Sequence, residues 1–105
     1  MEPAKHIRVE LRGQLVAETA NGFTVHEKGL PDRYYIPRAD VTAELRAGSS
    51  EGVCPWKGSW RYFDVVVGET HIANGAWTYY ETKPVTDRMR DFVAFYETKF
   101  SIDVS

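Results

Sequence analysis

Only one cysteine, Cys54, occurs among the 105 residues, so the chain cannot close a disulfide within itself. Its fold must therefore rest on apolar burial, and a domain of this size buries roughly two-thirds of the surface that its unfolded chain exposes. A lone thiol is typical of a reducing compartment, and we expect a cytoplasmic protein. The length indicates one domain over residues 1–105.

Long apolar runs and basic runs are also missing. No stretch approaches the roughly 20 apolar residues of a membrane-spanning helix, and residues 1–5 lack the apolar region of a signal peptide. Lys and Arg nowhere form a run, and the net charge is −2. We therefore expect no binding to nucleic acid or to a membrane.

Paired metal ligands are absent as well. The chain has no Cys-x-x-Cys motif, and His6, His26 and His71 lack the spacing of a ligand pair. We expect no metal and no cofactor, and a surface or packing role for each histidine.

What the chain does have is many short stretches in which apolar and polar residues alternate. Residues 7–11 alternate in this way and predict a half-buried strand, and a turn at Arg12-Gly13 leads into a second strand over Gln14–Thr19. The dipeptide Asn21-Gly22 favours a hairpin into a third strand, Phe23–His26.

The next segment predicts a short strand and then less regular structure. Arg33–Ile36 is typical of a short strand that Pro37 ends, because proline has no N–H for a ladder. Asp40 is placed to cap a short turn or helix over residues 42–46. The small, polar residues 47–52 indicate a mobile loop.

Residues 65–72 predict a hairpin with the two-residue turn Gly68-Glu69. The register of that turn sets Trp60 opposite Trp77, Tyr62 opposite Gly75, and Tyr79 beside Gly58, with Gly75 leaving room for the Tyr62 ring. Four aromatic residues then share one face of the hairpin, Trp60, Tyr62, Trp77 and Tyr79. The apolar residues of the other face are expected in the core, Phe63, Val65, Val67, Ile72 and Ala76.

Towards the C-terminus, Thr86 is a candidate helix cap, and residues 85–96 fit helical spacing. Residues 92–96 fit a strand as well, and periodicity does not decide between the two in so short a run. Phe100, Ile102 and Val104 alternate as a last strand. The fold expected is mainly β, a small barrel or two packed antiparallel sheets, with one short helix near the C-terminus.

Five ordered motifs make the chain resemble a known family. They are Gly29-Leu30-Pro31, Arg33–Arg38 with Asp40-Val41, Cys54–Gly58 with Tyr62, Ala76–Tyr79, and Val93–Tyr96. The chain resembles, over roughly residues 7–104, a widespread and mostly bacterial family of small domains of unknown function that is filed under a nucleotidyltransferase-like label. The resemblance implies a mainly β fold similar to the β-tent group, which includes methionine sulfoxide reductases of the B type, and it implies no particular activity.

The nucleotidyltransferase label finds no support in the motifs. That chemistry uses paired carboxylates to hold magnesium, usually Asp-x-Asp after a Gly-Ser turn, and no such pair follows Gly48-Ser49 or Gly58-Ser59. Two residues depart from the family pattern: Trp60 stands where a small residue is usual, and Tyr80 where a proline is common. Both add bulk near the expected pocket.

Cys54 is the candidate catalytic residue. A thiolate is a nucleophile, and Lys57 nearby would favour that charged form. The alternative is a buried cysteine that acts as a small hydrophobic residue.

Arg38 and Lys57 are candidates for holding an anionic ligand, because arginine offers a planar fork and lysine a mobile point charge. The alternative has Arg38 bound to Asp40 and Lys57 in solvent. The complete set of expected ligand-binding residues is Tyr35, Arg38, Lys57, Tyr62, Trp77 and Tyr79.

The function predicted from the sequence is the binding of a small anionic or polar ligand in an aromatic-lined pocket. One alternative is a cysteine-dependent enzyme or redox protein that uses Cys54. The other is a protein–protein interaction domain, in which exposed aromatic residues form the contact surface. The sequence leaves open whether the chain catalyses a reaction and whether it is a monomer or a homodimer.

Overall fold

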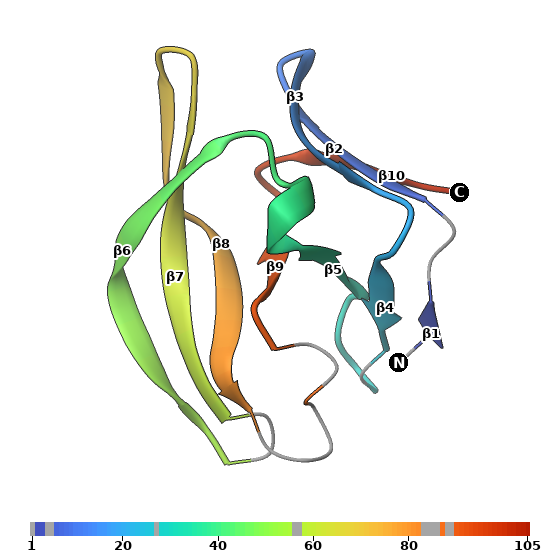
Figure 1. Ribbon diagram of the computed structural model, residues 1–105, viewed down its shortest axis with the longest axis vertical. Helices are drawn as coiled ribbons and strands as arrows, with labels where there is room; N and C mark the ends of the chain where they lie inside the picture. The colour runs from blue at the N-terminus through green and yellow to red at the C-terminus, as the bar shows by residue number, and fades with distance from the viewer. Residues whose placement is uncertain (1, 4–5, 27, 56–57, 83–86, 88–89) are drawn as a thin grey trace.

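The computed structural model describes residues 2–3, 6–26, 28–55, 58–82, 87 and 90–105. The described chain forms two antiparallel sheets, one of seven strands in the order β1-β4-β5-β9-β8-β7-β6 and one of three in the order β10-β2-β3 (Figure 1). Between β5 and β6 lies a single 3-10 turn, Arg38–Asp40. The prediction of a mainly β fold with two antiparallel sheets is confirmed, and the described strands do not close into a barrel.

The small sheet contains β2 (Ile7–Leu11), β3 (Gln14–Thr19) and β10 (Ser101–Val104). The large sheet contains β1 (Glu2–Pro3), β4 (Phe23–Val25), β5 (Arg33–Pro37), β6 (Glu44–Cys54), β7 (Gly58–Val67), β8 (Thr70–Thr82) and β9 (Phe92–Phe95). The β2–β3 and β7–β8 hairpins project from the same end of the molecule (Figure 1). No helix within these described segments is long and apolar enough to cross a membrane.

The predicted hairpin at Asn21-Gly22 is wrong, because β4 pairs with β1 and β5 rather than with β3. The chain instead crosses from one sheet to the other here. A side chain at Gly22 would come within 2.3 Å of Ile7 Cδ1, so the glycine permits a close crossing. The backbone N–H of Asn21 donates to Thr19 Oγ1 at 2.9 Å, and Thr19 Oγ1 donates to Asp40 Oδ2 at 2.7 Å, which fixes the crossing to the 3-10 turn.

Neither the turn or helix over residues 42–46 nor the loop over residues 47–52 is present. Thr42 and Ala43 donate their backbone N–H groups to Val16 O, and β6 then runs from Glu44 beside β7. The pairing shifts register between Ala47 and Glu51. The small, polar composition that predicts a loop therefore belongs to an irregular edge strand.

The predicted C-terminal helix is also wrong where the structure describes it. Phe92–Phe95 is strand β9, which pairs with β5 on one side and β8 on the other. Val93 and Ala94 are both fully buried, on opposite faces of a central strand. Four other residues of the predicted helix, 85, 86, 88 and 89, lie outside the described residues.

The predicted turn at Gly68-Glu69 is confirmed, since Val67 pairs with Thr70 and Gly68 has a φ of 57°. Beyond the turn the register differs from the prediction by two residues at Tyr62 and Trp60, because β8 bulges between Ile72 and Ala76, and by three at Gly58, because the pairing shifts again between Ser59 and Trp60. The observed partners are Trp60 with Tyr79, Tyr62 with Trp77, and Gly58 with Thr82.

The predicted assignment of side chains to the two faces of the hairpin is still correct. Side chains alternate with a period of two, so a shift of two residues leaves each side chain on its own face. The predicted role of Gly75 does not survive, because Gly75 lies against Phe100 instead of opposite Tyr62. A side chain at Gly75 would come within 3.1 Å of the Phe100 ring.

The alternation separates two apolar clusters on the two faces of the large sheet. The first cluster packs between the sheets and includes Ile7, Val9, Val16, Ile36, Phe63, Val65, Val93 and Phe95. The second lies on the other face and is mainly aromatic, with Tyr35, Trp77, Tyr79, Val25 and Ala94 at its centre. The first cluster is an ordinary core, whereas the second borders the candidate site.

Candidate functional site

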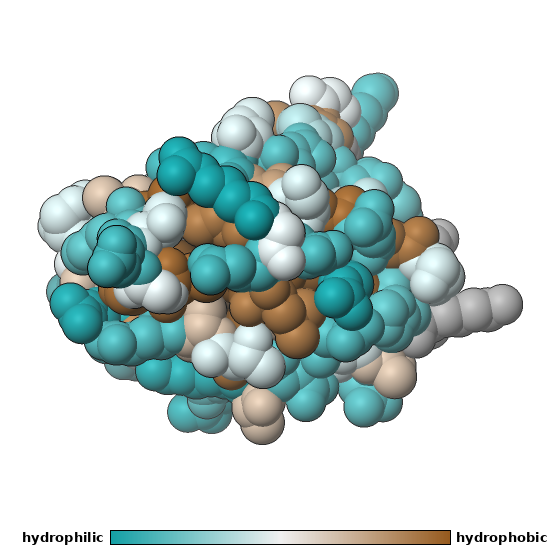
Figure 2. Space-filling model, turned by 90° about the horizontal axis from the view of Figure 1, so that it is seen from above, coloured by the Kyte–Doolittle hydropathy of each residue, from teal (hydrophilic) through white to brown (hydrophobic). Residues whose placement is uncertain are grey.

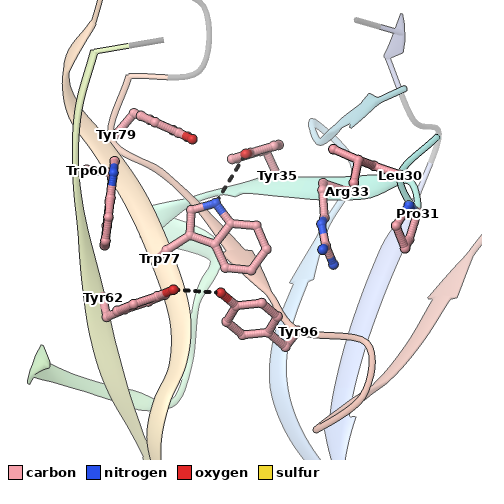
Figure 3. Close-up of a pocket in the computed structure, with 9 residues that line it drawn as sticks. All are labelled: Leu30, Pro31, Arg33, Tyr35, Trp60, Tyr62, Trp77, Tyr79 and Tyr96. Carbon is pink, nitrogen blue, oxygen red and sulfur yellow. Dashed lines mark hydrogen bonds between the residues drawn. The ribbon is translucent and has the colours of Figure 1, made fainter. Parts of the chain in front are cut away.

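A cavity of about 200 Å³ opens on the aromatic face of the large sheet. It is lined by nine residues: Leu30, Pro31, Arg33, Tyr35, Trp60, Tyr62, Trp77, Tyr79 and Tyr96. Figure 3 shows the two side chains from β7, Trp60 and Tyr62, on one side of Trp77, and the side chains of residues 30, 31 and 33 on its other side. The cavity is therefore walled largely by aromatic rings.

Strand periodicity explains which residues reach the cavity. Residues two apart on a strand share a face, so β7 contributes Trp60 and Tyr62, and β8 contributes Trp77 and Tyr79. The shifted register then sets Tyr62 beside Trp77 and Trp60 beside Tyr79, which concentrates four rings on adjacent strands.

Two hydrogen bonds fix the polar atoms of the cavity, and both are drawn in Figure 3. The indole Nε1–H of Trp77 donates to Tyr35 Oη at 3.2 Å. The hydroxyl oxygens of Tyr62 and Tyr96 lie 3.0 Å apart, and one of the two donates to the other. Tyr35 is only 1% exposed, and its own hydroxyl proton has no acceptor among the residues that the structure describes.

Ring contacts reinforce this arrangement. The ring centroids of Trp77 and Tyr96 lie 4.5 Å apart, and those of Trp60 and Tyr62 lie 5.0 Å apart in an edge-to-face arrangement. Tyr35 meets Trp77 edge to face at 6.3 Å. Such pairs contribute about 0.5–1.5 kcal/mol each beyond their buried area, so the walls are held in place without a ligand.

Arg33 is the single ionised residue among the nine that line the cavity. Its guanidinium carbon lies 5.4 Å from the ring centroid of Trp77 and 5.7 Å from that of Tyr96, within the range of a cation–π interaction. Among the described residues no carboxylate forms an ion pair with Arg33. The charge of Arg33 is thus near two ring faces and has no anionic partner in the part of the chain that the structure describes.

Three tyrosines of the cavity, Tyr35, Tyr79 and Tyr96, remain protonated at neutral pH. Burial raises the pKa of Tyr35, and burial together with the nearness of Cys54 and Tyr62 raises the pKa of Tyr79. Burial and the hydrogen bond with Tyr62 raise the pKa of Tyr96 to about 12. These phenols are therefore neutral hydroxyl groups that can donate hydrogen bonds.

Of the six residues that the sequence predicts to bind a ligand, four line this cavity: Tyr35, Tyr62, Trp77 and Tyr79. Arg38 does not; its guanidinium carbon lies 4.9 Å from the ring centroid of Phe63, which belongs to the cluster between the sheets. Asp40 is engaged by Thr19 instead of Arg38. Lys57 lies outside the described residues.

Cys54 is the last residue of β6, opposite Gly58, and is a free, partly buried thiol. It packs against the edge of the aromatic cluster and is close enough to Tyr79 to affect the pKa of that phenol. It is not among the nine lining residues.

Five lining residues were not predicted as site residues: Leu30, Pro31, Arg33, Trp60 and Tyr96. Arg33 and Tyr96 belong to motifs that sequence reasoning identified. Arg33 and Tyr35 stand two apart on β5, and this spacing alone puts them on one face of a strand. Tyr96 directly follows β9, whose predicted identity was ambiguous. Ala94 pairs with Trp77, and Tyr96 stands two residues further on, so a strand assignment for residues 92–96 would have put Tyr96 on the face of Trp77.

A second hollow, of about 680 Å³, is wider and differs in character. It is lined by residues from the β2–β3 turn, the start of β8 and the β9–β10 connection. Figure 2 views the end with the two hairpin tips, where hydrophobic residues gather in the centre among hydrophilic ones. Three of the four ionisable side chains in this hollow already have partners: Glu10 with Arg8, His71 with Asp64, and Lys99 with the carbonyl of Ala73. The aromatic cavity is the stronger candidate.

The fold and the cavity define a small two-sheet β domain with an aromatic pocket on its outer face. The chain belongs to the family described as Domain of unknown function (DUF427), labelled NTP_transf_9, whose model matches residues 1–105. The resemblance inferred from the motifs is thereby confirmed. No curated protein matches the chain.

The family label refers to a chemistry that requires carboxylates, and none of the nine lining residues is acidic. Within the described residues no group of three or more His, Cys, Asp or Glu side chains is arranged to hold a metal ion.

Proposed function

We propose that this protein is a binding module for a small anionic or polar ligand, which enters the aromatic cavity beside Arg33. The observation that carries the proposal is the guanidinium of Arg33, which lies within cation–π distance of Trp77 and Tyr96 and has no carboxylate partner among the described residues. Ligand pockets are typically apolar and aromatic, with a few converging polar groups, and this cavity has that composition.

The preorganised walls support the same function. A rigid pocket spares the ligand much of the entropic cost of ordering side chains on binding. Hydrogen bonds and ring contacts already hold Trp77, Tyr35, Tyr62 and Tyr96 in place. The sequence predicts that Arg38 binds the anionic ligand. In this proposal Arg33 binds it instead, because Arg33 lines the cavity and Arg38 lies over Phe63.

The test is an NMR titration of 15N-labelled protein with a panel of small probes of different charge, including acetate, benzoate, benzamide and benzylammonium. The indole N–H resonance of Trp77, assigned by its loss in Trp77→Phe, reports directly on the cavity. We expect a saturable shift of this resonance with at least one probe. If no probe shifts it up to the limit of solubility, the proposed function is wrong.

Two arginine variants separate the structural assignment from the sequence-based one. Arg33→Gln should weaken the binding of the responding anionic probe, while Arg38→Gln should leave that binding unchanged. The opposite pattern would return the anion-binding role to Arg38.

A further inference from the structure

We infer that the ligand of this cavity is an aromatic carboxylate with a single ring, whose carboxylate pairs with Arg33 and whose ring lies between the aromatic walls. This inference rests on the proposed function and narrows it to one chemical class. Charge, hydrogen-bonding capacity and shape each contribute a separate argument.

The charge of the cavity favours an anion. Arg33 supplies one positive charge, and the lining residues supply no negative charge to balance it. The acidic residue next to it in the chain, Asp32, is engaged elsewhere, with its Oδ1 2.7 Å from His26 Nδ1. A cationic ligand would therefore be repelled at close range, in spite of the aromatic walls that otherwise suit cations.

The hydrogen-bonding groups favour a ligand that accepts. The contacts of Arg33 with Trp77 and Tyr96 are cation–π contacts, which leave the N–H groups of the guanidinium able to donate hydrogen bonds. Tyr35 accepts from Trp77 and still has its own proton to donate. In the Tyr62–Tyr96 pair one proton makes the bond and the other stays available. Donors thus outnumber acceptors in the cavity, and a carboxylate offers two oxygens to them.

The shape favours one flat ring. The faces of aromatic rings carry negative charge density, so an anionic group is disfavoured against Trp60 or Trp77 and is directed towards Arg33. The remainder of the ligand must then be apolar enough to contact ring faces. A volume of about 200 Å³ is below the roughly 300–1,000 Å³ of pockets for drug-sized molecules, which limits the ligand to about one ring.

A comparison of four probes tests the inference, again by the Trp77 indole resonance. Benzoate has the charge and the ring, benzamide keeps the ring without the charge, cyclohexanecarboxylate keeps the charge without a flat ring, and benzylammonium reverses the charge. We expect benzoate to bind at least about tenfold more tightly than benzamide, since a hydrogen bond to a charged group contributes about 1.5–3 kcal/mol. It should also bind more tightly than cyclohexanecarboxylate, and benzylammonium should give no saturable shift.

The possible failures are distinguishable. Equal binding of benzamide and benzoate would overturn the assignment of an anion, and equal binding of cyclohexanecarboxylate would overturn the assignment of a flat ring. In both cases the proposed function would stand, because probes still shift Trp77. If none of the four probes shifts it, the inference fails together with the proposed function.

Variants of Arg33 test whether this residue is responsible for the tighter binding of benzoate. Arg33→Gln should lower benzoate affinity at least about tenfold, to the level of benzamide. Arg33→Lys keeps the charge but loses the planar fork, and should bind benzoate several-fold more weakly than the wild type. Arg46→Gln is the matched control, since Arg46 is an exposed arginine on β6 paired with Glu44. If Arg33→Gln fails to fold, Arg33→Lys decides, and unchanged benzoate binding in that variant would contradict the carboxylate assignment.

Discussion

The hydroxyl oxygens of Tyr62 and Tyr96 lie 3.0 Å apart, although 34 positions separate the two residues in the chain. This bond joins β7 to the residue that follows β9, across the intervening strand β8. It therefore closes one side of the aromatic cavity by a contact that neither local propensity nor hairpin geometry produces. The polar end of the cavity depends on this pair and on the bond between Trp77 and Tyr35.

Removal of either hydroxyl of the pair should cost stability. We expect Tyr62→Phe and Tyr96→Phe each to lower the free energy of unfolding by about 1 kcal/mol, since a hydrogen bond contributes about 0.5–1.5 kcal/mol net. The double variant should lose less than the sum of the two single losses, because both remove the same bond. Urea unfolding of the four proteins measures this coupling. Tyr34→Phe is the control, because the Tyr34 hydroxyl has no hydrogen-bond partner among the described residues; additive losses would contradict the pairing.

The raised pKa of Tyr96 predicts a loss of stability at alkaline pH. Burial and the bond with Tyr62 raise that pKa from 10.0 to about 12, so between these values the unfolded state loses the proton while the folded state keeps it. Stability is therefore fully present below pH 10 and falls as the pH rises towards 12. Urea midpoints measured from pH 9 to pH 12 should decline, and less steeply in Tyr96→Phe. Equal slopes in both proteins would contradict the assignment.

Gly58 is predicted to be irreplaceable by alanine. Its φ is 112°, and a Cβ there would lie 1.9 Å from the carbonyl oxygen of Glu81 on the neighbouring strand. We expect Gly58→Ala to cost more than about 3 kcal/mol, from backbone strain and the clash together. Gly13→Ala is the matched control, since Gly13 also has a positive φ but has open space around it, and it should cost only about 1 kcal/mol. Thermal unfolding of the two variants measures their losses of stability. Similar losses would show that backbone strain, without the clash, accounts for the effect at Gly58.

Trp60 is predicted to set the size of ligand that the cavity accepts. Its indole lies across Gly52 on β6, where a Cβ would come within 2.7 Å of the ring, and its other neighbour is the Tyr62 ring. Truncation in Trp60→Ala should extend the cavity towards β6. The wild type should prefer benzoate to 2-naphthoate, and Trp60→Ala should reverse that preference, as measured by the ratio of the two dissociation constants. An unchanged ratio would place the ring of the ligand away from Trp60.

The sequence predicts the strands and faces of this fold well, because period-two alternation is a local property. Residues 7–11 and 14–19 form strands and residues 65–72 form a hairpin, as their patterns indicate, and the aromatic face of the β7–β8 hairpin contains the four predicted rings. The alternation does not indicate which strands pair with each other. The Asn21-Gly22 turn signal is typical of a hairpin, yet the chain there crosses between the sheets, and Gly22 lies close against Ile7.

The register of the β7–β8 pairing could not be predicted from the sequence for a related reason. The bulge in β8 depends on Asn74, which has a positive φ of 50°, donates its backbone N–H to Asp64 and bonds through its side chain to Ser49. These contacts join three strands, so no single segment reveals them. The same limit explains why Arg38 was predicted at the site and Arg33 was not. Both residues lie in one motif, but the direction of Arg38 is set by the 3-10 turn that follows β5.

The central claim is that the aromatic cavity holds a small carboxylate ligand against Arg33. A crystal structure of the protein grown with a saturating concentration of benzoate tests it most directly. We predict density for one ring within the cavity, with the carboxylate oxygens at hydrogen-bond distance from Arg33 and one oxygen near Tyr35 Oη or the Tyr62–Tyr96 pair. A cavity that contains only water at that concentration, or benzoate bound at Arg38 instead, would contradict the account.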